Sequence, residues 1–231
     1  MGQVFRRQGY HLAAYVTIAA FLYGAIALLP EGQGVRRGLT TAEWIWLSWV
    51  LAGAHQAWIW FFWRMALYLG KIRRWFGAAG FPLYKIGYVV LGLARLLCIV
   101  PISSSSPHTA PIPPLLALAL IVLSTPLIVW VAYSFAVYFG FDRAAGADHF
   151  DPDYRGMPLE TRGAFRYFRN PGYSVGLLLL YHPGLLWQSA LGLIVAAAHH
   201  VFVWVAYFCS ELPDMEEIYG RRGRSGPTDA A

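Results

Sequence analysis

The chain has 231 residues, of which 58% are hydrophobic and only 13% are charged, and it carries a formal net charge of +6. Soluble domains are typically about 25% charged and about 45–50% apolar, so this composition excludes an ordinary soluble domain and predicts a protein dissolved in lipid. The small positive surplus lies mostly between apolar runs, which indicates membrane topology and argues against a nucleic-acid partner. The two cysteines, Cys98 and Cys209, form no CxxC pattern, so no metal site is expected.

Four apolar runs in the first part of the chain are long enough for membrane-spanning helices, which need about 20 residues. They cover residues 10–29, 41–68, 81–102 and 115–139. The second run carries six of the ten tryptophans, one group at residues 44–49 and another at residues 58–63. This separation predicts aromatic belts at the two membrane interfaces. An aromatic cage for a methylated ammonium is the sharper alternative.

A polar connection at residues 140–170 holds five arginines and five acidic residues and precedes a last apolar region at residues 171–209. His182, Pro183 and Gly184 interrupt that region, so we expect a tight hairpin of two segments that is broken there. The first of the two segments is short for a full crossing. The predicted fold is an all-α, polytopic transmembrane bundle with five to six membrane segments, the last two of which form the hairpin.

This pattern divides the chain into N-terminal transmembrane helices at residues 1–114, a core at residues 115–220 and a basic tail at residues 221–231 that we expect to be disordered. If every segment crosses, the clustered Lys and Arg residues fall on one side, and only Arg36 and Arg37 fall on the other. By the positive-inside rule, both termini and the polar connection are then cytoplasmic.

Several ionisable side chains lie inside the apolar runs, where such residues are rare and usually functional. They are His55, Arg64, Lys85, Arg95, His199 and His200. Arg64 and Lys85 lie near the cytoplasmic interface, and we expect their charges to extend to the membrane surface. Arg95 and His55 lie deeper. His199 and His200 are about 100° apart on a helix, so at most one is a candidate base, and a hydrogen bond between helices is an equal alternative.

One polar cluster lies at the start of the last apolar region and reads Arg166-Tyr-Phe-Arg169-Asn170-Pro171-Gly172-Tyr173-Ser174-Val175-Gly176. Pro171 suits the first turn of a helix and Asn170 suits its N-cap. A helix N-terminus flanked by arginines is a candidate anion site. The structural alternative is a capped helix whose arginines only set the topology. Gly172 and Gly176 form a pair of small residues that is typical of a helix contact.

A second cluster follows that region and reads Glu211-Leu-Pro213-Asp214-Met-Glu216-Glu217-Ile-Tyr219. Pro213 suits a helix start. Asp214, Glu216 and Glu217 would then lie in the first turn, where the helix dipole favours negative charge. That account leaves out Glu211, which lies at the membrane exit before the new helix.

The two clusters, with the hairpin between them, resemble the C-terminal signature of the membrane methyltransferases that act on phosphatidylethanolamine and on isoprenylcysteine. In that superfamily an Arg-(His or Asn)-Pro-x-Tyr-x-x-Gly element precedes a helical hairpin and an exit motif that contains Glu. The matching residues here are Arg169, Asn170, Pro171, Tyr173, Gly176 and Glu211. The spacing from Glu211 to Tyr219, together with Tyr138-Phe139-Gly140, is closer to the phospholipid branch. Leu212 stands where that branch often has a second glutamate.

The resemblance implies an S-adenosylmethionine-dependent methyltransferase that acts on a membrane phospholipid, with phosphatidylethanolamine or its methylated derivatives as the expected acceptor. It also implies that the cofactor binds at the cytoplasmic end through Arg166, Arg169, Asn170, Pro171, Tyr173, Gly176, Glu211, Glu216 and Glu217. An ethanolamine ammonium must first lose a proton, because an alkylamine has a pKa of about 10.4. The candidate catalytic groups are Glu211, Tyr173, His182 and His199.

Two other functions remain compatible with the sequence. One is carboxyl methylation of a prenylated cysteine, which needs no base because the acceptor is already an anion. The other is a membrane scaffold or transporter that has the same fold without catalysis. Assays of both methyl acceptors test the first, and binding of S-adenosylmethionine tests the second.

Overall fold

The computed structural model describes residues 2–29 and 35–220. The long helices are α1 (Gln8–Leu28), α2 (Thr41–Leu67), α4 (Gly80–Leu97), α6 (Pro114–Ser134) and α11 (Ala190–Ala206). The short α-helices are α3 (Lys71–Phe76), α5 (Ile99–Ser105), α7 (Phe141–Ala144), α8 (Ala147–Phe150), α9 (Pro171–Ser174), α10 (Tyr181–Leu186) and α12 (Leu212–Tyr219). Turns of 3₁₀-helix cover Gly77–Ala79, Pro152–Gly156, Gly163–Arg166 and Gly176–Leu180, and π-helical turns at Phe135–Phe139 and Tyr207–Glu211 continue α6 and α11. The described part of the chain contains no strand, and the all-α prediction is confirmed.

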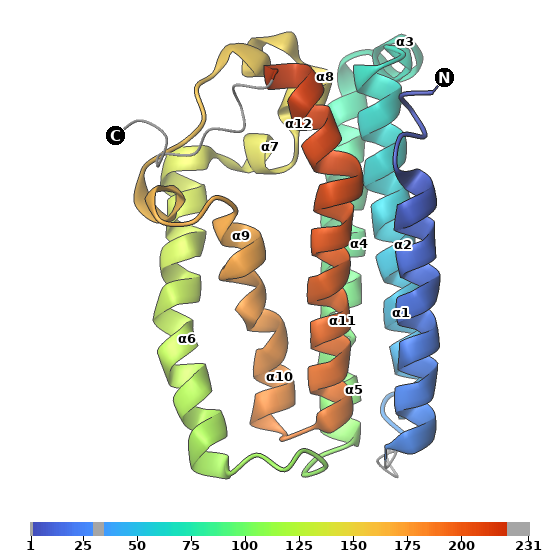
Figure 1. Cartoon of the computed structure of the whole chain (residues 1–231), viewed down its shortest axis with the longest axis vertical. Helices are drawn as coiled ribbons and strands as arrows, with labels where there is room; N and C mark the ends of the chain where they lie inside the picture. The colour runs from blue at the N-terminus through green and yellow to red at the C-terminus, as the bar shows by residue number, and fades with distance from the viewer. Residues whose placement is uncertain (1, 30–34, 221–231) are drawn as a thin grey trace.

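Figure 1 shows an elongated bundle whose long helices run along its long axis. At one end lie α3, α7, α8 and α12 together with the connection at residues 140–170, and this end is termed the polar end. The loop before α6 lies at the opposite end. The segment formed by α9 and α10 runs between α6 and α11 and contacts both. The beginning of α9 and the end of α11 therefore both lie toward the polar end.

Four helical segments are long and apolar enough to cross a membrane: Gln8–Leu28, Lys71–Ser105, Pro114–Phe139 and Ala190–Tyr219. They make the chain an integral membrane protein, although the prediction of five to six segments exceeds this number. The difference lies in α2, which is long but less apolar, and in residues 171–186, which are divided among short helices. The exposed leucines and valines of α6, such as Leu115 and Leu123, are those expected of a helix that faces lipid.

Sequence-encoded caps fix the starts of α2 and α11. Thr40 Oγ1 accepts the Glu43 backbone N–H at 3.2 Å, and the Glu43 carboxylate accepts the Thr40 N–H at 2.7 Å, which forms a capping box. Ser189 Oγ accepts the Gly192 N–H at 3.0 Å at the start of α11. Both capped helix starts lie at the end of the bundle opposite the polar end.

The hairpin turn lies at residues 187–189, after α10, and the prediction of a break at residues 182–184 is wrong. Pro183 falls in the first turn of α10, where its missing N–H interrupts no helical hydrogen bond. A Cβ at Gly184 would lie 2.8 Å from Leu193, so this glycine allows α10 to pack closely on α11. The two residues that look like a break in the sequence are therefore parts of a helix.

The tryptophans of α2 serve the interior more than the membrane interfaces. Trp49 and Trp63 are buried, and Trp63 stacks on His149 with the ring centroids 4.0 Å apart. Trp58 and Trp60 donate their indole N–H groups to backbone carbonyls at 3.1 and 2.9 Å. The interpretation as two interfacial belts is wrong for the buried pair, because α2 packs against α1, α4, α5 and α11 and turns most of its surface toward protein.

The main core joins residues from both halves of the chain. It gathers, among others, Leu22, Trp49, Ile99, Leu191 and Phe202. The division of the chain near residue 114 stays a prediction. The expected tail at residues 221–231 lies outside the described residues.

Candidate functional site

Tyr173 and Glu211, one from each sequence cluster, are in direct contact. The Tyr173 hydroxyl donates to Glu211 Oε2 at 2.5 Å, a length typical of a hydrogen bond to a carboxylate. Tyr173 belongs to α9, and Glu211 ends the π-helical turn that follows α11. Such turns add a residue to a helix and occur frequently at functional sites. The hairpin thus brings together two residues that are far apart in the sequence.

Backbone contacts hold Tyr173 in place on the short helix α9. Asn170 stands at the N-cap position, but its side chain makes no capping bond, so that expectation is wrong. Its ψ of 72° departs from the extended conformation of a capping residue. Instead, the Ser174 hydroxyl donates to the Asn170 carbonyl at 2.9 Å. His200 of α11 donates a hydrogen bond from its Nε2 to the Tyr173 carbonyl oxygen, at 2.7 Å.

Pro171 occupies the first turn of α9, as predicted, and the glycines that follow it face α6. A Cβ at Gly172 would lie 3.1 Å from the Phe135 ring, and one at Gly176 would lie 3.6 Å from Val131. The predicted helix contact through small residues is confirmed, with the tighter approach at Gly172.

Two tyrosines of α4 lie near Glu211, which also interacts electrostatically with His149, Asp148 and Asp214. Tyr84 and Tyr88 both interact electrostatically with the Glu211 carboxylate, and their ring centroids lie 5.8 Å apart. Within the described residues, Glu211 forms no ion pair. Both tyrosines precede the signature region, so the sequence does not single them out beyond their spacing of one helical turn.

A buried charge network anchors α12 directly after Glu211. Arg64 Nε lies 2.9 Å from Asp214 Oδ2, and neither side chain is exposed. Tyr68 donates to Asp214 Oδ1 at 2.8 Å. The expectation that Arg64 extends to the membrane surface is wrong, because Asp214 neutralises its charge inside the protein. An arginine in a membrane helix, such as Arg64, and an acid just after the last apolar run, such as Asp214, are each energetically costly without a partner. That cost was the sequence signal that the two could form a pair.

His149 of α8 ties the polar connection to this network. Its Nδ1 lies 2.9 Å from Asp148, which also accepts the Tyr219 hydroxyl at 2.9 Å, and its Nε2 lies 3.5 Å from Asp214. Burial by itself lowers the pKa of the imidazole. Hydrogen bonds to Asp148 and Asp214 and their charges outweigh burial and raise the pKa from 6.5 to about 9. The ring is therefore a cation between two carboxylates at neutral pH.

His182 and His199 are bonded to other helices. His182 Nε2 lies 2.9 Å from the Ser124 hydroxyl of α6, and His199 Nε2 lies 2.6 Å from the Ser48 hydroxyl of α2. Such bonds between helices are typical of polar residues in membrane bundles. The structure does not join either histidine to Glu211 by a hydrogen bond or an ion pair.

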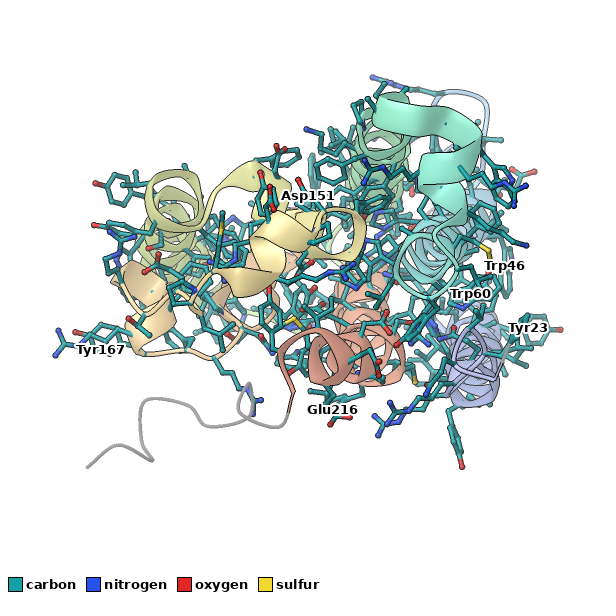
Figure 2. All side chains as sticks on the ribbon, turned by 90° about the horizontal axis from the view of Figure 1, so that it is seen from above. Tyr23, Trp46, Trp60, Asp151, Tyr167 and Glu216 are labelled. Carbon is teal, nitrogen blue, oxygen red and sulfur yellow. The ribbon has the colours of Figure 1, made fainter. Side chains whose placement is uncertain are left out.

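The remaining charged candidates lie at the surface of the polar end. Arg166 and Arg169 are exposed and form no ion pair within the described part of the chain. Glu216 pairs with Arg6 at 3.4 Å, and Figure 2, which looks onto this end, shows it at the outer edge of α12. Glu217 is exposed.

A groove of about 960 Å³ opens beside the end of α6. It is lined by residues 138–143, Tyr154 and residues 157–162. Three of its four charged residues are in ion pairs, Glu160 with Arg162 at 2.8 Å and Asp142 with Lys85 at 2.7 Å, and Arg143 donates to the Pro158 carbonyl at 2.7 Å. The groove includes Tyr138-Phe139-Gly140 but not Glu211. In residues 2–29 and 35–220, no group of three or more His, Cys, Asp or Glu side chains is placed to hold a metal ion.

Comparison with known proteins gives one finding. Residues 113–222 match the model of the phospholipid methyltransferase family. No curated protein and no solved structure is significantly similar to the chain. The matched region contains both sequence clusters, the polar connection and the contact between Tyr173 and Glu211, whereas Arg64, Tyr84 and Tyr88 precede it. Residues 113–222, slightly less than half of the chain, are thus similar to the phospholipid methyltransferase family.

Proposed function

We propose that the protein transfers a methyl group from S-adenosylmethionine to the headgroup nitrogen of phosphatidylethanolamine or of its methylated derivatives. The observation that carries this proposal is the contact between Tyr173 and Glu211, which unites the two elements of the family signature around one carboxylate. Glu211 accepts the Tyr173 hydroxyl, interacts electrostatically with His149, Asp148 and Asp214, and forms no ion pair within the described part of the chain. A carboxylate in such surroundings favours a cationic ligand, and both the sulfonium and the ammonium are cations.

The residues at the polar end fit the cofactor. When bound, S-adenosylmethionine supplies a methyl group on a positively charged sulfur. Glu211 is the acid that would meet its sulfonium or its amino group through a charge-assisted contact. Arg166 and Arg169, which form no ion pair with the described residues, would hold its carboxylate.

Glu211 also suits the role of the base that the acceptor requires. At neutral pH an alkylamine is mostly protonated, since its pKa is about 10.4, and it cannot attack a methyl carbon until it loses that proton. Tyr173 donates to Oε2 and orients the carboxylate, so Oε1 can accept a proton from the ammonium. Aromatic rings such as those of Tyr88 and Tyr173 attract a methylated ammonium.

Orientation is the second requirement, because the new C–N bond forms in line with the C–S bond that breaks. The π-helical turn fixes where the Glu211 carboxylate stands, and α9 fixes Tyr173 against it. We further propose that the polar end faces the cytoplasm. The exposed arginines and lysine of α3 and the arginines of the connection gather there, as the positive-inside rule requires.

Methyl transfer by the full chain in lipid nanodiscs, with S-adenosylmethionine labelled on its methyl group, tests the proposal. We expect label in phosphatidylethanolamine, and we expect Glu211→Gln to lower turnover about 10²-fold or more. Asp153→Asn removes an exposed carboxylate of the polar connection and should leave turnover near wild type. If the label appears in a prenylated-cysteine peptide and not in lipid, the methyl acceptor would be the prenylated cysteine and not the phospholipid. If the protein neither transfers a methyl group nor binds the cofactor in calorimetry, the result would point to a scaffold or transporter.

A further inference from the structure

The interior of the bundle holds an arginine without a counter-ion. Arg95 lies in the last turn of α4 and is 3% exposed. Its Nε and Nη1 atoms are buried and have no hydrogen-bond partner, and it forms no ion pair within residues 2–29 and 35–220. By contrast, the buried Arg64 is neutralised by Asp214. An unpaired charge at membrane depth is costly and is normally kept for an anionic partner.

Two histidines from other helices lie near this arginine. His55 of α2 is buried, and neither ring nitrogen has a partner of good hydrogen-bond geometry. His199 of α11 is fully buried, and its Nδ1 has no partner. The charge of Arg95 acts on both rings. A Cβ at Gly92, one turn before Arg95, would lie 3.4 Å from His55 Nε2, so the histidine packs directly against this glycine.

This polar group is coupled to the contact between Tyr173 and Glu211. Arg95 interacts electrostatically with the hydroxyls of Tyr88 and Tyr173. Each of these hydroxyls also interacts with the Glu211 carboxylate. The His55 and Tyr88 rings lie 5.2 Å apart. The two tyrosines therefore stand between a deep cation and a carboxylate nearer the polar end.

We propose that Arg95, His55 and His199 form an anion site that holds the phosphodiester of the acceptor phospholipid, with its ethanolamine nitrogen directed to Glu211. The order of charges fits, because the phosphate of a phospholipid is nearer the acyl chains than the amine is. A guanidinium is well suited to two oxygens of one phosphate. The lipid's identity rests on the proposed function. Arg95 and His55 lie outside the residues matched by the family.

Thermal unfolding of the delipidated full chain in detergent tests the site without methyl transfer. Dioleoylphosphatidylethanolamine should raise the unfolding temperature of wild type, and dioleoylglycerol, which lacks the phosphate, should not. Arg95→Gln should weaken the apparent lipid affinity about tenfold or more. Because the buried Arg95 Nε and Nη1 atoms have no hydrogen bond to lose and Arg95 forms no ion pair with the described residues, the lipid-free variant should be at least as stable as wild type. Arg73→Gln, an exposed site on α3, is the control and should keep the lipid effect.

Three results would overturn the proposal. The first is that the lipid stabilises Arg95→Gln as much as it stabilises wild type. The second is that lipid-free Arg95→Gln is clearly less stable than lipid-free wild type. The third is that inorganic phosphate alone stabilises wild type fully, which would assign the site to a soluble anion. Weakened binding of S-adenosylmethionine with intact lipid binding would likewise assign Arg95 to the cofactor. His55→Gln, which has no hydrogen bond to break, should weaken lipid binding less than Arg95→Gln does. Absence of methyl transfer would count against the proposed function only, since lipid binding is measured separately.

Discussion

The guanidinium of Arg64 contacts residues on both sides of Glu211 in the sequence. Its Nε pairs with Asp214 at 2.9 Å, and its Nη2 donates to the carbonyls of Cys209 and Ser210 at 3.4 and 3.2 Å. These carbonyls belong to the π-helical turn that ends at Glu211. A residue of the second helix therefore positions the segment that carries the candidate catalytic carboxylate.

Asp214→Asn should destabilise the protein strongly, because it leaves the buried Arg64 without a counter-charge. Breaking one partner of a buried pair typically costs about 3–5 kcal/mol. Unfolding of the purified protein by a denaturing detergent measures the change, and exposed Glu217→Gln is the control. Replacing the pair together, with Arg64→Met and Asp214→Leu, should restore part of the stability. Equal stability of Asp214→Asn and wild type would mean that the pair does not hold the helices together.

Stability should fall as pH rises from about 6.5 through about 9. The folded state raises the pKa of His149 above its ordinary value of 6.5, so the contribution of its protonated form is complete below 6.5 and is lost as pH passes about 9. The slope from this one group is at most about 1.4 kcal/mol per pH unit. Unfolding temperatures at several pH values measure it. His149→Gln should flatten the curve in this window, and a slope that persists in the variant would assign it to another group.

Tyr173→Phe should lower methyl transfer while leaving the fold intact. The change keeps the ring and removes the hydroxyl that donates to Glu211 at 2.5 Å. A hydrogen bond to a charged group contributes about 1.5–3 kcal/mol, which corresponds to roughly 10- to 150-fold in turnover. Tyr167→Phe, at an exposed position, is the matched control. Turnover of Tyr173→Phe close to that of the control would show that the hydroxyl does not orient the carboxylate.

Arg169→Ala should weaken binding of S-adenosylmethionine about tenfold or more, since a charge-assisted contact to the cofactor carboxylate would be lost. Arg73→Ala removes an exposed charge from the same end of the bundle and should have little effect. Calorimetric titration of the two variants compares them directly. Similar affinities would leave Arg169 with a role in topology alone.

Labelling of single cysteines should place the polar end in the cytoplasm. A cysteine at Pro111, in the loop at the opposite end, should react with an impermeant thiol reagent on intact cells. A cysteine at the exposed Asp153, in the polar connection, should react only after the membrane is opened. The reverse labelling pattern would mean that the polar end faces away from the cytoplasm. The native Cys98 and Cys209 are buried, which limits their background.

Local pattern was enough to predict the long helices and the two clusters that meet at the site. Apolar runs set α1, α2 and α6 to within a few residues, because length and apolarity decide membrane insertion. The resemblance predicted that Tyr173 and Glu211 belong together, and the structure brings them into contact. The family match supports that resemblance independently.

What the sequence did not reveal depends on partners that are distant along the chain. Arg64 near a helix end looks like a surface charge until Asp214, in the last helix, is placed beside it. Gly184 looks like a turn residue until the closeness of Leu193 shows that it serves packing. No local rule predicts such pairings, because the period of one helix says which face is apolar and not which residue lies opposite.

The division of residues 171–186 into short helices has a consequence for what can lie beside them. Each short helix leaves end groups of its backbone without partners in the same helix, and acyl chains cannot hydrogen-bond to such groups. Contacts with α6 and α11 cover part of this segment, and the side chains of Leu179 and Leu186 remain exposed. A phospholipid headgroup brings its own donors and acceptors and is compatible with the same backbone. The backbone ends of the broken segment therefore suit contact with the head of a lipid better than contact with its tails.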